Sequence, residues 1–330
     1  MPANRLLAHY VDNRRHLPWR AGPGEPAPDP YRVWLSEVML QQTTVAAVRP
    51  RFERFVARWP TVDALAAAPE EDVLGEWAGL GYYARARNLI ACARVVAARG
   101  GFPGDEAGLR ALPGVGEYTA AAVAAIAFGE RVAAVDTNVE RVVARVHRLV
   151  SPRKGEVRAL AAAMIGDAHP GDFTQAMMDL GATICRPRAP DCGRCPLRPD
   201  CAAFASGEAE AFPARKVKTV RPVRHGTAWW IERDGGLWLV RRPATGLLGG
   251  MAALPGDDWT AVEQSAAPPL ASVSHVFTHF ALRLEVVVAP TPVGDGWWHP
   301  LDQLADAGLP TLYRKAVERV LAARHPRAVA

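Results

Sequence analysis

The sequence predicts an all-α region followed by a smaller α+β domain. Its 330 residues are enough for two domains. Up to residue 183, apolar residues recur at helical spacing, and a Gly-x-Gly turn at residues 114–116 joins two of these segments. After a polar, basic stretch at residues 202–224, the pattern changes to short apolar strands. These three observations predict two domains of different fold class.

Composition indicates a globular protein. Hydrophobic residues make up 49% of the chain and charged residues 22%, and no apolar run reaches the length of a membrane span. The net charge of +5 permits an anionic partner but does not require one. Charged residues interrupt the first 19 positions, which argues against a secretion signal, so the expected location is the cytoplasm.

The helical region is expected to open with a helix at residues 4–15, followed by a loop at residues 16–29 that is rich in proline and glycine. Pro30 then begins an apolar helix that runs through Leu40 and is expected to be buried. The remaining helices are expected at residues 44–59, 62–67, 70–77, 83–99, 104–111, 118–128, 139–150, 156–169 and 174–183.

Glu37 lies inside the helix that Pro30 begins. None of its neighbours three or four positions away carries a positive charge, so no local salt bridge is available. A buried carboxyl without a partner has a raised pKa and can donate a proton near neutral pH. The alternative is that Glu37 pairs with a distant arginine or lies at the solvent edge, which is the commoner outcome for one isolated glutamate.

Asp136 stands just before the helix expected at residues 139–150, where it can act as the N-cap residue. Capping alone explains an aspartate at this position. It also keeps the carboxylate ionised, because a helix N-terminus favours negative charge. Glu37 and Asp136 therefore occupy environments that move their pKa values apart, as expected of an acid and an anion in one site, provided that the fold brings them together.

Two glycine-containing turns have a functional and a structural explanation each. Gly114 and Gly116 permit positive φ, and a turn of this kind at a helix start directs free N–H groups at one point, where a phosphate can bind. Close packing at a plain helical corner explains them almost as well. The turn at residues 79–83 presents aromatic side chains that could enter a base stack, or could simply cover a helix start.

Four of the five cysteines lie between residues 185 and 201. In a reducing compartment such a cluster more often holds a metal than a set of disulfides. Four cysteine ligands suit either structural zinc or a cubane iron–sulfur cluster, and the spacing alone does not separate the two. The candidate ligands are Cys185, Cys192, Cys195 and Cys201, whereas Cys92 is expected to be a buried apolar residue.

Three stretches together resemble the adenine DNA glycosylases of the MutY family, which belongs to the helix-hairpin-helix, iron–sulfur DNA glycosylase superfamily. Residues 34–43 are similar to the catalytic helix of that family, and residues 79–89 to its intercalating turn. Residues 175–182, with the cysteine spacing that follows, are similar to its cluster-binding end. The resemblance is close over about residues 4–201 and looser beyond them.

The resemblance implies a helix-hairpin-helix glycosylase fold for residues 1–204. This region would hold a six-helix barrel at about residues 30–136, and a cluster domain formed by the N-terminal helix and about residues 137–204. A linker at residues 205–224 and a Nudix-like domain at residues 225–330 would follow. The resemblance also implies a [4Fe–4S] cluster on the four cysteines, and a monomer that binds double-stranded DNA.

The implied reaction is removal of adenine mispaired with 8-oxoguanine or guanine in base excision repair, after the base is flipped out of the duplex. Glu37 would protonate the adenine ring, and Asp136 would stabilise the oxocarbenium-like sugar. Asn138 would position groups near Asp136, and Tyr118 stands where the family carries a Ser or Tyr that assists at the sugar. The DNA contacts implied in the helical region are Gln42, Tyr82, Gly114 and Gly116.

Tyr118 also bears on the type of glycosylase. The chain reads Asp-Thr-Asn at residues 136–138, where many family members have Asp-Gly-Asn and endonuclease III-type enzymes have Asp-Thr. Those lyases place a Schiff-base lysine at the position of Tyr118, and in this chain no lysine precedes Lys154. Because imine formation needs an amine, a monofunctional glycosylase is expected.

The C-terminal half resembles the Nudix-like recognition domain of the same family at residues 242–251 and 275–280. The clustered glutamates of Nudix hydrolases are absent from the sequence, so the resemblance implies a reader of 8-oxoguanine. Thr278 keeps the hydroxyl of a common Ser, with His279 beside it, and Leu248 replaces a common Trp. For His275, packing on the sheet is an equally good explanation. Strands are expected at residues 227–231, 237–241, 275–278 and 281–288, and a closing helix at residues 312–323.

Two rival functions remain at the level of sequence. The first is an endonuclease III-like or thymine-mismatch DNA glycosylase. The second, from another class, is a non-catalytic iron–sulfur DNA-binding protein in which Glu37 and Asp136 are purely structural.

Overall fold

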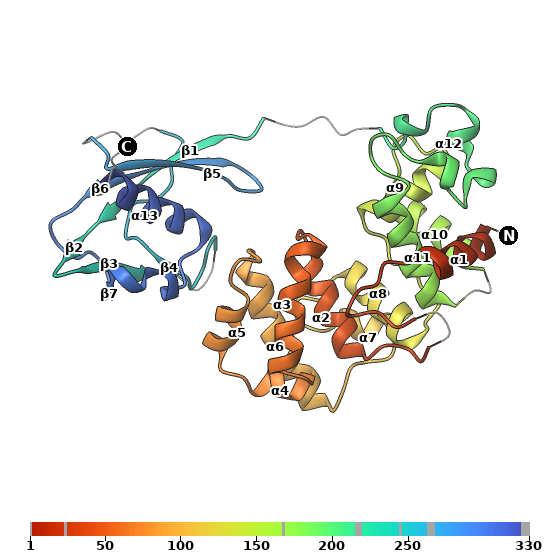
Figure 1. Ribbon diagram of the computed structural model, residues 1–330, viewed down its shortest axis with the longest axis horizontal. Coiled ribbons are helices and arrows are strands. Elements are labelled where there is room, and N and C mark those ends of the chain that lie inside the picture. The colour runs from red at the N-terminus through yellow and green to blue at the C-terminus, as the bar shows by residue number, and fades with distance from the viewer. Residues whose placement is uncertain are drawn as a thin grey trace, which may run out of the picture. The chain divides into compact units, whose positions relative to one another are not determined.

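The computed structural model describes residues 2–22, 25–166, 169–214, 220–243, 246–262 and 268–324. The chain forms two compact units, coloured along the sequence in Figure 1. One comprises Met1–Glu76 and Arg85–Val217, and the other Trp77–Ala84 and Lys218–Ala330. Within the ranges described, no helix has the length and apolar character needed to cross a membrane.

The first unit is helical. Each helix expected in the first 183 residues is present, with its ends shifted by no more than four residues, although residues 167 and 168 of one expected helix lie outside the described residues. The helices are α1 (Pro2–Asn13), α2 (Pro30–Leu40), α3 (Val45–Arg58), α4 (Val62–Ala67), α5 (Glu70–Glu76), α6 (Tyr83–Arg99), α7 (Glu106–Arg110), α8 (Glu117–Phe128), α9 (Thr137–Val146), α10 (Lys154–Ile165), α11 (Pro170–Thr183) and α12 (Ala202–Ala205).

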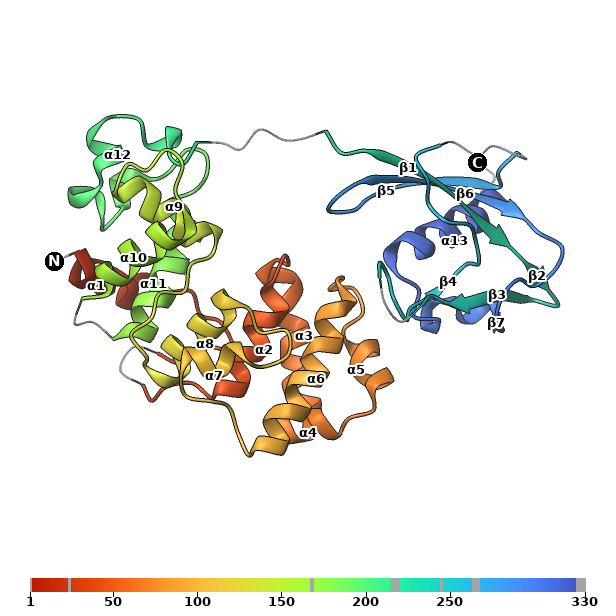
Figure 2. The ribbon, with the colours of Figure 1, turned by 180° about the vertical axis from the view of Figure 1, so that it is seen from behind.

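Helix α8 is the centre of this unit. It is rich in alanine, and residues 119–127 are all buried, so it contacts neighbours on every side. It packs against α2, α7 and α11, which surround it in Figures 1 and 2. The approach of α11 is close, since a Cβ atom added at Gly171 would lie 2.9 Å from the carbonyl oxygen of Ala125. Small side chains on α8 therefore allow α2 and α11 to approach each other across it.

Helix α2 is almost fully buried, as its apolar sequence predicts. Asp29 caps it by accepting a hydrogen bond from the backbone N–H of Tyr31, and Pro30 occupies the first turn. The Tyr31 hydroxyl donates to the carbonyl of Trp59 across 2.8 Å, which ties the start of α2 to the end of α3. The helix that carries Glu37 is thus fixed at its N-terminal end.

The second unit contains two sheets and a helix (Figure 2). In the first sheet β6 (Ala281–Val288) lies between β1 (Val223–Trp230), parallel to it, and β5 (Ala271–Val276), antiparallel to it. In the second, β3 (Gly236–Arg241) pairs with β2 (Glu232–Arg233), β4 (Ala252–Ala253) and β7 (Gly296–Pro300). Helix α13 (Thr311–Arg324) packs on β5 and β6, and buried residues of both sheets and the helix form one core.

The elements of this unit were predicted from the sequence less accurately than those of the helical unit. The strand expected at residues 275–278 is β5, which ends at Val276, and residues 277–280 form a turn instead. Strands β2, β4 and β7 and the short helix η4 (Leu301–Asp306) were not predicted. Two of these strands have only two residues each, too short for an alternating pattern.

Part of the predicted linker is packed against the helical unit. Between α12 and Ala214 the chain forms a single turn, η3 (Ala209–Ala211). The buried Arg145 donates from Nε to the carbonyl of Phe212 at 3.0 Å, and the N–H of Ala214 donates to the carbonyl of Val150 at 2.8 Å. Residues 215–219 lie outside the described residues, and the boundaries at residues 204 and 225 stay predictions.

Candidate active site

Glu37 is buried in α2, with 6% of its surface exposed. The hydroxyl of Tyr118, at the start of α8, donates a hydrogen bond to its Oε2 atom at 2.8 Å. Burial raises the pKa of Glu37, and the negative charge of Asp136 raises it further. The Tyr118 hydrogen bond and the positive charge of Arg20 partly oppose that shift. Glu37 therefore keeps its proton to a higher pH than an exposed glutamate does.

Tyr118 is a neutral donor in this arrangement. Burial raises the pKa of its hydroxyl well above the usual range, and the charges of Glu37 and Asp136 act in the same direction. The hydroxyl also lies 4.0 Å from the sulfur of Met178 on α11. Three helices thus meet at one phenolic oxygen, since Glu37 comes from α2, Tyr118 from α8 and Met178 from α11.

Asp136 caps α9, as expected from its place before that helix. Its Oδ1 atom accepts from the backbone N–H groups of Asn138 and Val139, at 2.9 and 2.7 Å. Its Oδ2 atom accepts from the side-chain amide of Asn138 at 2.9 Å. Three donors and a helix N-terminus suit a negative charge at this carboxylate. The side chain of Asn138 holds Asp136 directly.

The fold brings the four proposed catalytic residues together, namely Glu37, Tyr118, Asp136 and Asn138. From the sequence alone, their proximity was a condition for catalysis and could not be shown. The negative charge of Asp136 raises the pKa values of both Glu37 and Tyr118, so the three groups interact electrostatically within one cluster. A buried carboxyl with a raised pKa and a carboxylate that caps a helix therefore lie in one cluster. Such a pair can donate a proton to one part of a ligand and stabilise positive charge on another.

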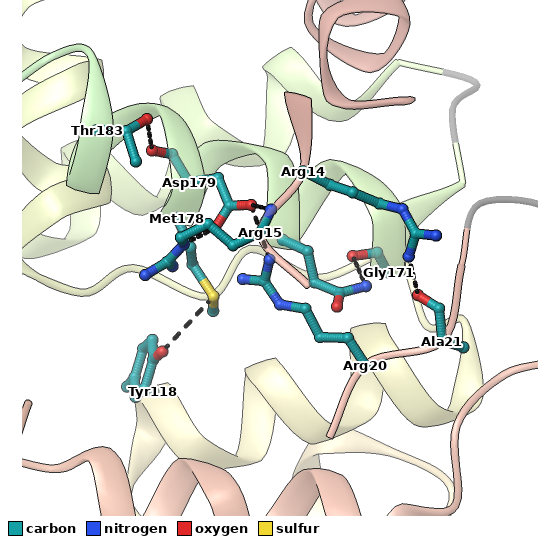
Figure 3. Close-up of polar contacts among 10 residues, drawn as sticks. Arg14, Arg15, Arg20, Ala21, Tyr118, Gly171, Met178, Asp179 and Thr183 are labelled. Carbon is teal, nitrogen blue, oxygen red and sulfur yellow. Dashed lines mark hydrogen bonds and ion pairs between the residues drawn. The ribbon is translucent and has the colours of Figure 1, made fainter. Parts of the chain in front are cut away.

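A buried ion-pair cluster beside Glu37 was missed by the sequence analysis. In Figure 3, Arg15 and Arg20 converge on Asp179 of α11. Arg20 donates to Oδ2 of Asp179 at 2.7 Å, and Arg15 donates from Nε to Oδ1 at 2.6 Å and from its backbone N–H to Oδ2 at 3.0 Å. Arginine is frequent in this chain, so no sequence signal distinguished these two arginines from the others. Their contact with Asp179 is visible only in the folded structure.

The side-chain oxygen of Gln175 is a hydrogen-bond acceptor for which the described residues supply no donor. It lies on α11 one turn before Met178 and Asp179, is 4% exposed, and donates from Nε2 to the carbonyl of Gly171 at 3.3 Å. Its Oε1 atom is buried and has no hydrogen-bond partner among the described residues. An unsatisfied buried acceptor costs free energy, and a ligand with an N–H group can recover it.

The hairpin before α8 contains one glycine that is sterically required. Gly114 has a φ of +71°, and a Cβ atom at this position would lie 2.5 Å from the Cβ of Asn88. Gly116 does not adopt the positive φ that a glycine permits, since its φ is −85°, and an added Cβ would meet nothing within 4 Å. Gly116 is instead the N-cap residue of α8 and makes no side-chain cap, which leaves the first N–H groups of that helix to another acceptor.

Two other predicted DNA contacts have unusual backbone conformations. Gln42, just after α2, and Tyr82, just before α6, have φ values of +58° and +49°, where side chains other than glycine are rare. Tyr82 is 51% exposed at the end of a turn in which Gly79 and Gly81 also have positive φ. Strained, exposed positions of this kind are frequent at binding sites.

The four cysteines of residues 185–201 line one pocket together with Arg145, Ile184 and Phe204. Arg145, only 2% exposed, lies 3.3 Å from the sulfur of Cys185 and donates to the carbonyls of Arg186 and Pro187. Among the residues described, no three His, Cys, Asp or Glu side chains are arranged to hold one metal ion. In a cubane cluster each thiolate binds a different iron atom, so its ligands stand further apart than those of one ion.

Arg141 joins the cysteine loop to the carboxylate cluster. Its Nη2 atom donates to Oδ1 of Asn138 at 3.0 Å and to the carbonyl of Gly181 at 2.6 Å. Its Nε atom donates to the carbonyl of Cys185 at 2.8 Å. Asn138, which holds Asp136, is therefore itself held by Arg141, and Arg141 also contacts Cys185.

Thr278 and His279 lie in the second unit, at the tip of the β5–β6 hairpin. The N–H of Phe277 donates to the carbonyl of Phe280 at 2.8 Å, which leaves Thr278 and His279 exposed in the turn. His275 is half-buried and packs edge-on against the ring of Phe277, with 4.6 Å between ring centroids. This contact agrees with the explanation that His275 packs on the sheet.

Comparison with known proteins yields two family matches. Residues 35–165 match the model of the HhH-GPD superfamily of base excision DNA repair proteins, and residues 227–319 match that of the NUDIX domain. The first match contains Glu37, Tyr118, Asp136 and Asn138, and the second contains Thr278 and His279. The two matches follow one another along the chain in the order that the sequence predicts.

Individual relatives agree with these matches. The chain is 37% identical over 293 residues to the adenine DNA glycosylase of Arabidopsis thaliana, covering 76% of this chain but only 46% of that protein. It is 41% identical over 227 residues to the adenine DNA glycosylase of Mycolicibacterium smegmatis, covering 66% of this chain and 76% of the relative. A solved thermostable thymine-DNA glycosylase has 29% identity and a TM-score of 0.56, covering 62% of this chain and 95% of that structure.

Proposed function

This chain belongs to the adenine DNA glycosylase (MutY) family, and on that premise we propose that it removes adenine mispaired with 8-oxoguanine or guanine in double-stranded DNA. It acts in base excision repair, as a monomer, on chromosomal DNA in the cytoplasm. The observation that carries the proposal is the contact between Glu37 and Tyr118 next to Asp136. An acid and an anion at one buried site are what N-glycosidic bond cleavage needs.

In the proposed reaction the adenine nucleotide is flipped out of the duplex. Glu37 transfers its proton to a ring nitrogen of adenine, so that the electron pair of the breaking N-glycosidic bond is accepted by a neutral leaving base. Asp136 stabilises the positive charge that develops on the sugar, and a water molecule adds to the sugar carbon and releases a proton to the Glu37 carboxylate left by the first step. Asn138 keeps the Asp136 carboxylate oriented through its side-chain amide.

Recognition of the adenine would use the polar groups around Glu37. The free acceptor of Gln175 can receive a hydrogen bond from the exocyclic amino group, which thymine and guanine do not present in the same position. Arg20 is held beside the acid by its hydrogen bond to Asp179 at 2.7 Å, in a pair whose two side chains are both less than 10% exposed. We infer that Gln175 and Arg20 orient the base for proton transfer.

The DNA backbone would be held by the helical unit. The uncapped N–H groups at the start of α8, next to Gly114 and Gly116, are available to a phosphate. Tyr82 would enter the base stack, and Gln42 would contact bases beside the mispair. In the second unit, Thr278 and His279 would read 8-oxoguanine.

A [4Fe–4S] cluster is the cofactor that we propose for the cysteine pocket. The four thiols face one pocket, and the buried guanidinium of Arg145 offsets negative charge at Cys185. Four cysteine thiols at the spacing of residues 185–201, in a chain that belongs to this family, support the cubane. Cys185, Cys192, Cys195 and Cys201 would bind the cluster, which would supply a structural crosslink for the loop.

The purified protein is therefore expected to be brown, with iron and acid-labile sulfide in about equal amounts, close to four atoms of each per chain for a cubane. Replacing Cys195 with Ser is expected to lower the iron content, whereas replacing the buried Cys92 with Ser should leave it unchanged. Metal analysis and visible absorption check both variants. A colourless protein with one equivalent of zinc would contradict the cluster.

The function is tested by base excision from labelled duplexes that carry adenine opposite 8-oxoguanine, guanine or thymine, and from a duplex with an oxidised thymine. We expect loss of adenine opposite 8-oxoguanine and guanine, with strand breaks that appear mainly after alkali treatment, because no lysine is available at Tyr118. Strand cleavage at the oxidised thymine without alkali would favour an endonuclease III-like enzyme. Mismatch binding without any excision would favour the DNA-binding protein.

The pH dependence of excision should report on the Glu37–Tyr118 hydrogen bond. Glu37 acts in its protonated form, so the excision rate falls as the pH rises through its raised pKa. The bond from Tyr118 stabilises the ionised carboxylate and lowers this pKa. In Tyr118→Phe the pKa should rise, and the falling limb of the rate profile should move to higher pH.

Single-turnover excision measured across a pH series checks this shift. Met178→Leu is the matched control, because the Met178 sulfur lies 4.0 Å from the same hydroxyl, on the α11 side of it, and carries no charge. Its falling limb should stay at the wild-type position. An unmoved limb in Tyr118→Phe would mean that Glu37 does not govern the profile.

A further inference from the structure

The tip of the β5–β6 hairpin is supported by a cluster of aromatic rings. Phe277 and Phe280 flank the two exposed tip residues, and their ring centroids are 5.0 Å apart. The indole of Trp259 stacks on Phe277, with 5.5 Å between centroids and 24° between planes, and meets Phe280 at 6.2 Å. Trp259 is therefore in contact with the residues on both sides of Thr278 and His279.

The position of Trp259 is fixed from the β1 side. The backbones of His225 and Thr260 exchange two hydrogen bonds, at 2.7 and 2.9 Å, which attach the segment next to Trp259 to the edge of β1. Directly beneath the indole lies Gly226, where a Cβ atom would come within 2.3 Å of the indole Cδ1. Only glycine leaves room for the ring at this point of β1.

Two arginines enclose the same cluster. The guanidinium of Arg242 lies 4.9 Å from the Trp259 ring centroid and donates to the hydroxyl of Tyr313 on α13 at 3.1 Å. The guanidinium of Arg224 lies 4.5 Å from the ring centroid of Phe280. Cation–π contacts at this range are attractive, so the arginines hold the rings against the core of the unit.

We propose that Trp259 is a positioning residue that fixes the Phe277–Phe280 turn and thereby sets the preference for 8-oxoguanine over guanine opposite the excised adenine. The inference deepens the proposed function and rests on it. A turn that is already ordered loses less conformational freedom when it binds, so more of the contact energy of Thr278 and His279 appears as affinity. Without the indole, the turn has to be ordered at the moment of binding.

The test uses Trp259→Leu, which keeps an apolar side chain but removes the stacked ring. Single-turnover excision, with enzyme in excess of DNA but below saturation, is compared for adenine opposite 8-oxoguanine and adenine opposite guanine. We expect the preference for 8-oxoguanine to fall about two- to tenfold, the range of one aromatic contact, with adenine opposite guanine unchanged. Trp238→Leu is the matched control, since Trp238 packs edge-on against Trp298 and donates to the carbonyl of Val293, away from the hairpin.

A double variant separates positioning from general stability. Thr278→Val removes the tip hydroxyl directly, so adding Trp259→Leu to it should cost little further preference if Trp259 acts through the tip. Equal losses with 8-oxoguanine and with guanine, or an unchanged preference in Trp259→Leu, would overturn the inference. Should the leucine variant fail to fold, Trp259→Phe replaces it and is expected to lose less of the preference.

Failure of the proposed function is recognised separately, because the wild-type protein would then release no adenine from either duplex. The positioning itself is measured without DNA, by hydrogen exchange at the amide of Phe277, which bonds to the carbonyl of Phe280. This amide should exchange faster in Trp259→Leu than in the wild type or in Trp238→Leu. Equal exchange rates in all three proteins would overturn the inference whatever the activity.

Discussion

The Glu37→Gln variant is expected to bind the mispaired duplex but to lose excision by about 10²- to 10⁴-fold, the contribution of a general acid. Glutamine has nearly the same shape as glutamic acid, and its carbonyl oxygen can still accept the hydrogen bond from Tyr118. It cannot supply the proton that makes adenine a leaving group. The loss should therefore appear in the chemical step and not in DNA affinity.

Single-turnover excision and equilibrium binding of the same duplex measure the two quantities. Glu53→Gln is the control, since Glu53 lies on α3 at the surface, where it is half-exposed beside Arg49. Its excision rate should equal that of the wild type. Wild-type excision by Glu37→Gln would remove Glu37 from the mechanism and leave it a structural residue.

The Asp179→Asn variant is expected to lose about 3–5 kcal/mol of unfolding free energy, as when one partner of a buried ion pair is removed. The side chain of Asp179 is 9% exposed and that of Arg20 is 6% exposed. The substitution leaves the guanidinium of Arg20 buried without a counter-charge, and Arg15 loses its partner as well. Urea unfolding followed by far-ultraviolet circular dichroism measures the loss.

Asp200→Asn is the matched control, because Asp200 pairs with Arg5 where both side chains are more than 30% exposed. Exposed pairs contribute at most about 1 kcal/mol. A loss in Asp179→Asn no greater than that in Asp200→Asn would mean that water reaches the Arg20 site freely.

The same variant has a predictable pH dependence. The hydrogen bonds and charges of Arg20 and Arg15 hold the pKa of Asp179 below its usual range, against the effect of burial. A depressed pKa adds stability that is fully present above the unfolded-state value, about 3.9, and is lost as the pH falls through the lower folded-state value. The stability difference between wild type and Asp179→Asn should therefore shrink only in strongly acidic solution.

The helical unit could be predicted well from the sequence because most of its helices have ten or more residues and several begin at a clear start signal. Pro30 at the start of α2 and Asp136 before α9 are examples, and Asp136 forms the expected cap. The second unit was harder because β7 begins with a glycine and ends with a proline, so its two tryptophans had no alternating context. Strand pairing between distant segments, such as β1 with β6, leaves no local signal.

Residues of the candidate site could be predicted only where they lie in a recognisable sequence motif. Glu37, Tyr118 and Asp136 could be named, because they lie in stretches that resemble a known family. Arg20 and Gln175 could not, since their importance comes from burial and from the partner each has or lacks. The Gly-x-Gly turn permits positive φ at both of its glycines, and the sequence could not tell that only Gly114 adopts it.

The alanines of α8 have a consequence for how this protein tolerates mutation. Residues 120–122 and 124–125 are buried to within 1% and contact no proposed substrate, yet each added methylene there would push α2 or α11 outward. Such a shift would separate Glu37 from Tyr118. In a deep mutational scan, positions that perform no chemistry should therefore be as intolerant as the acid itself, and larger residues should be excluded more strictly than glycine.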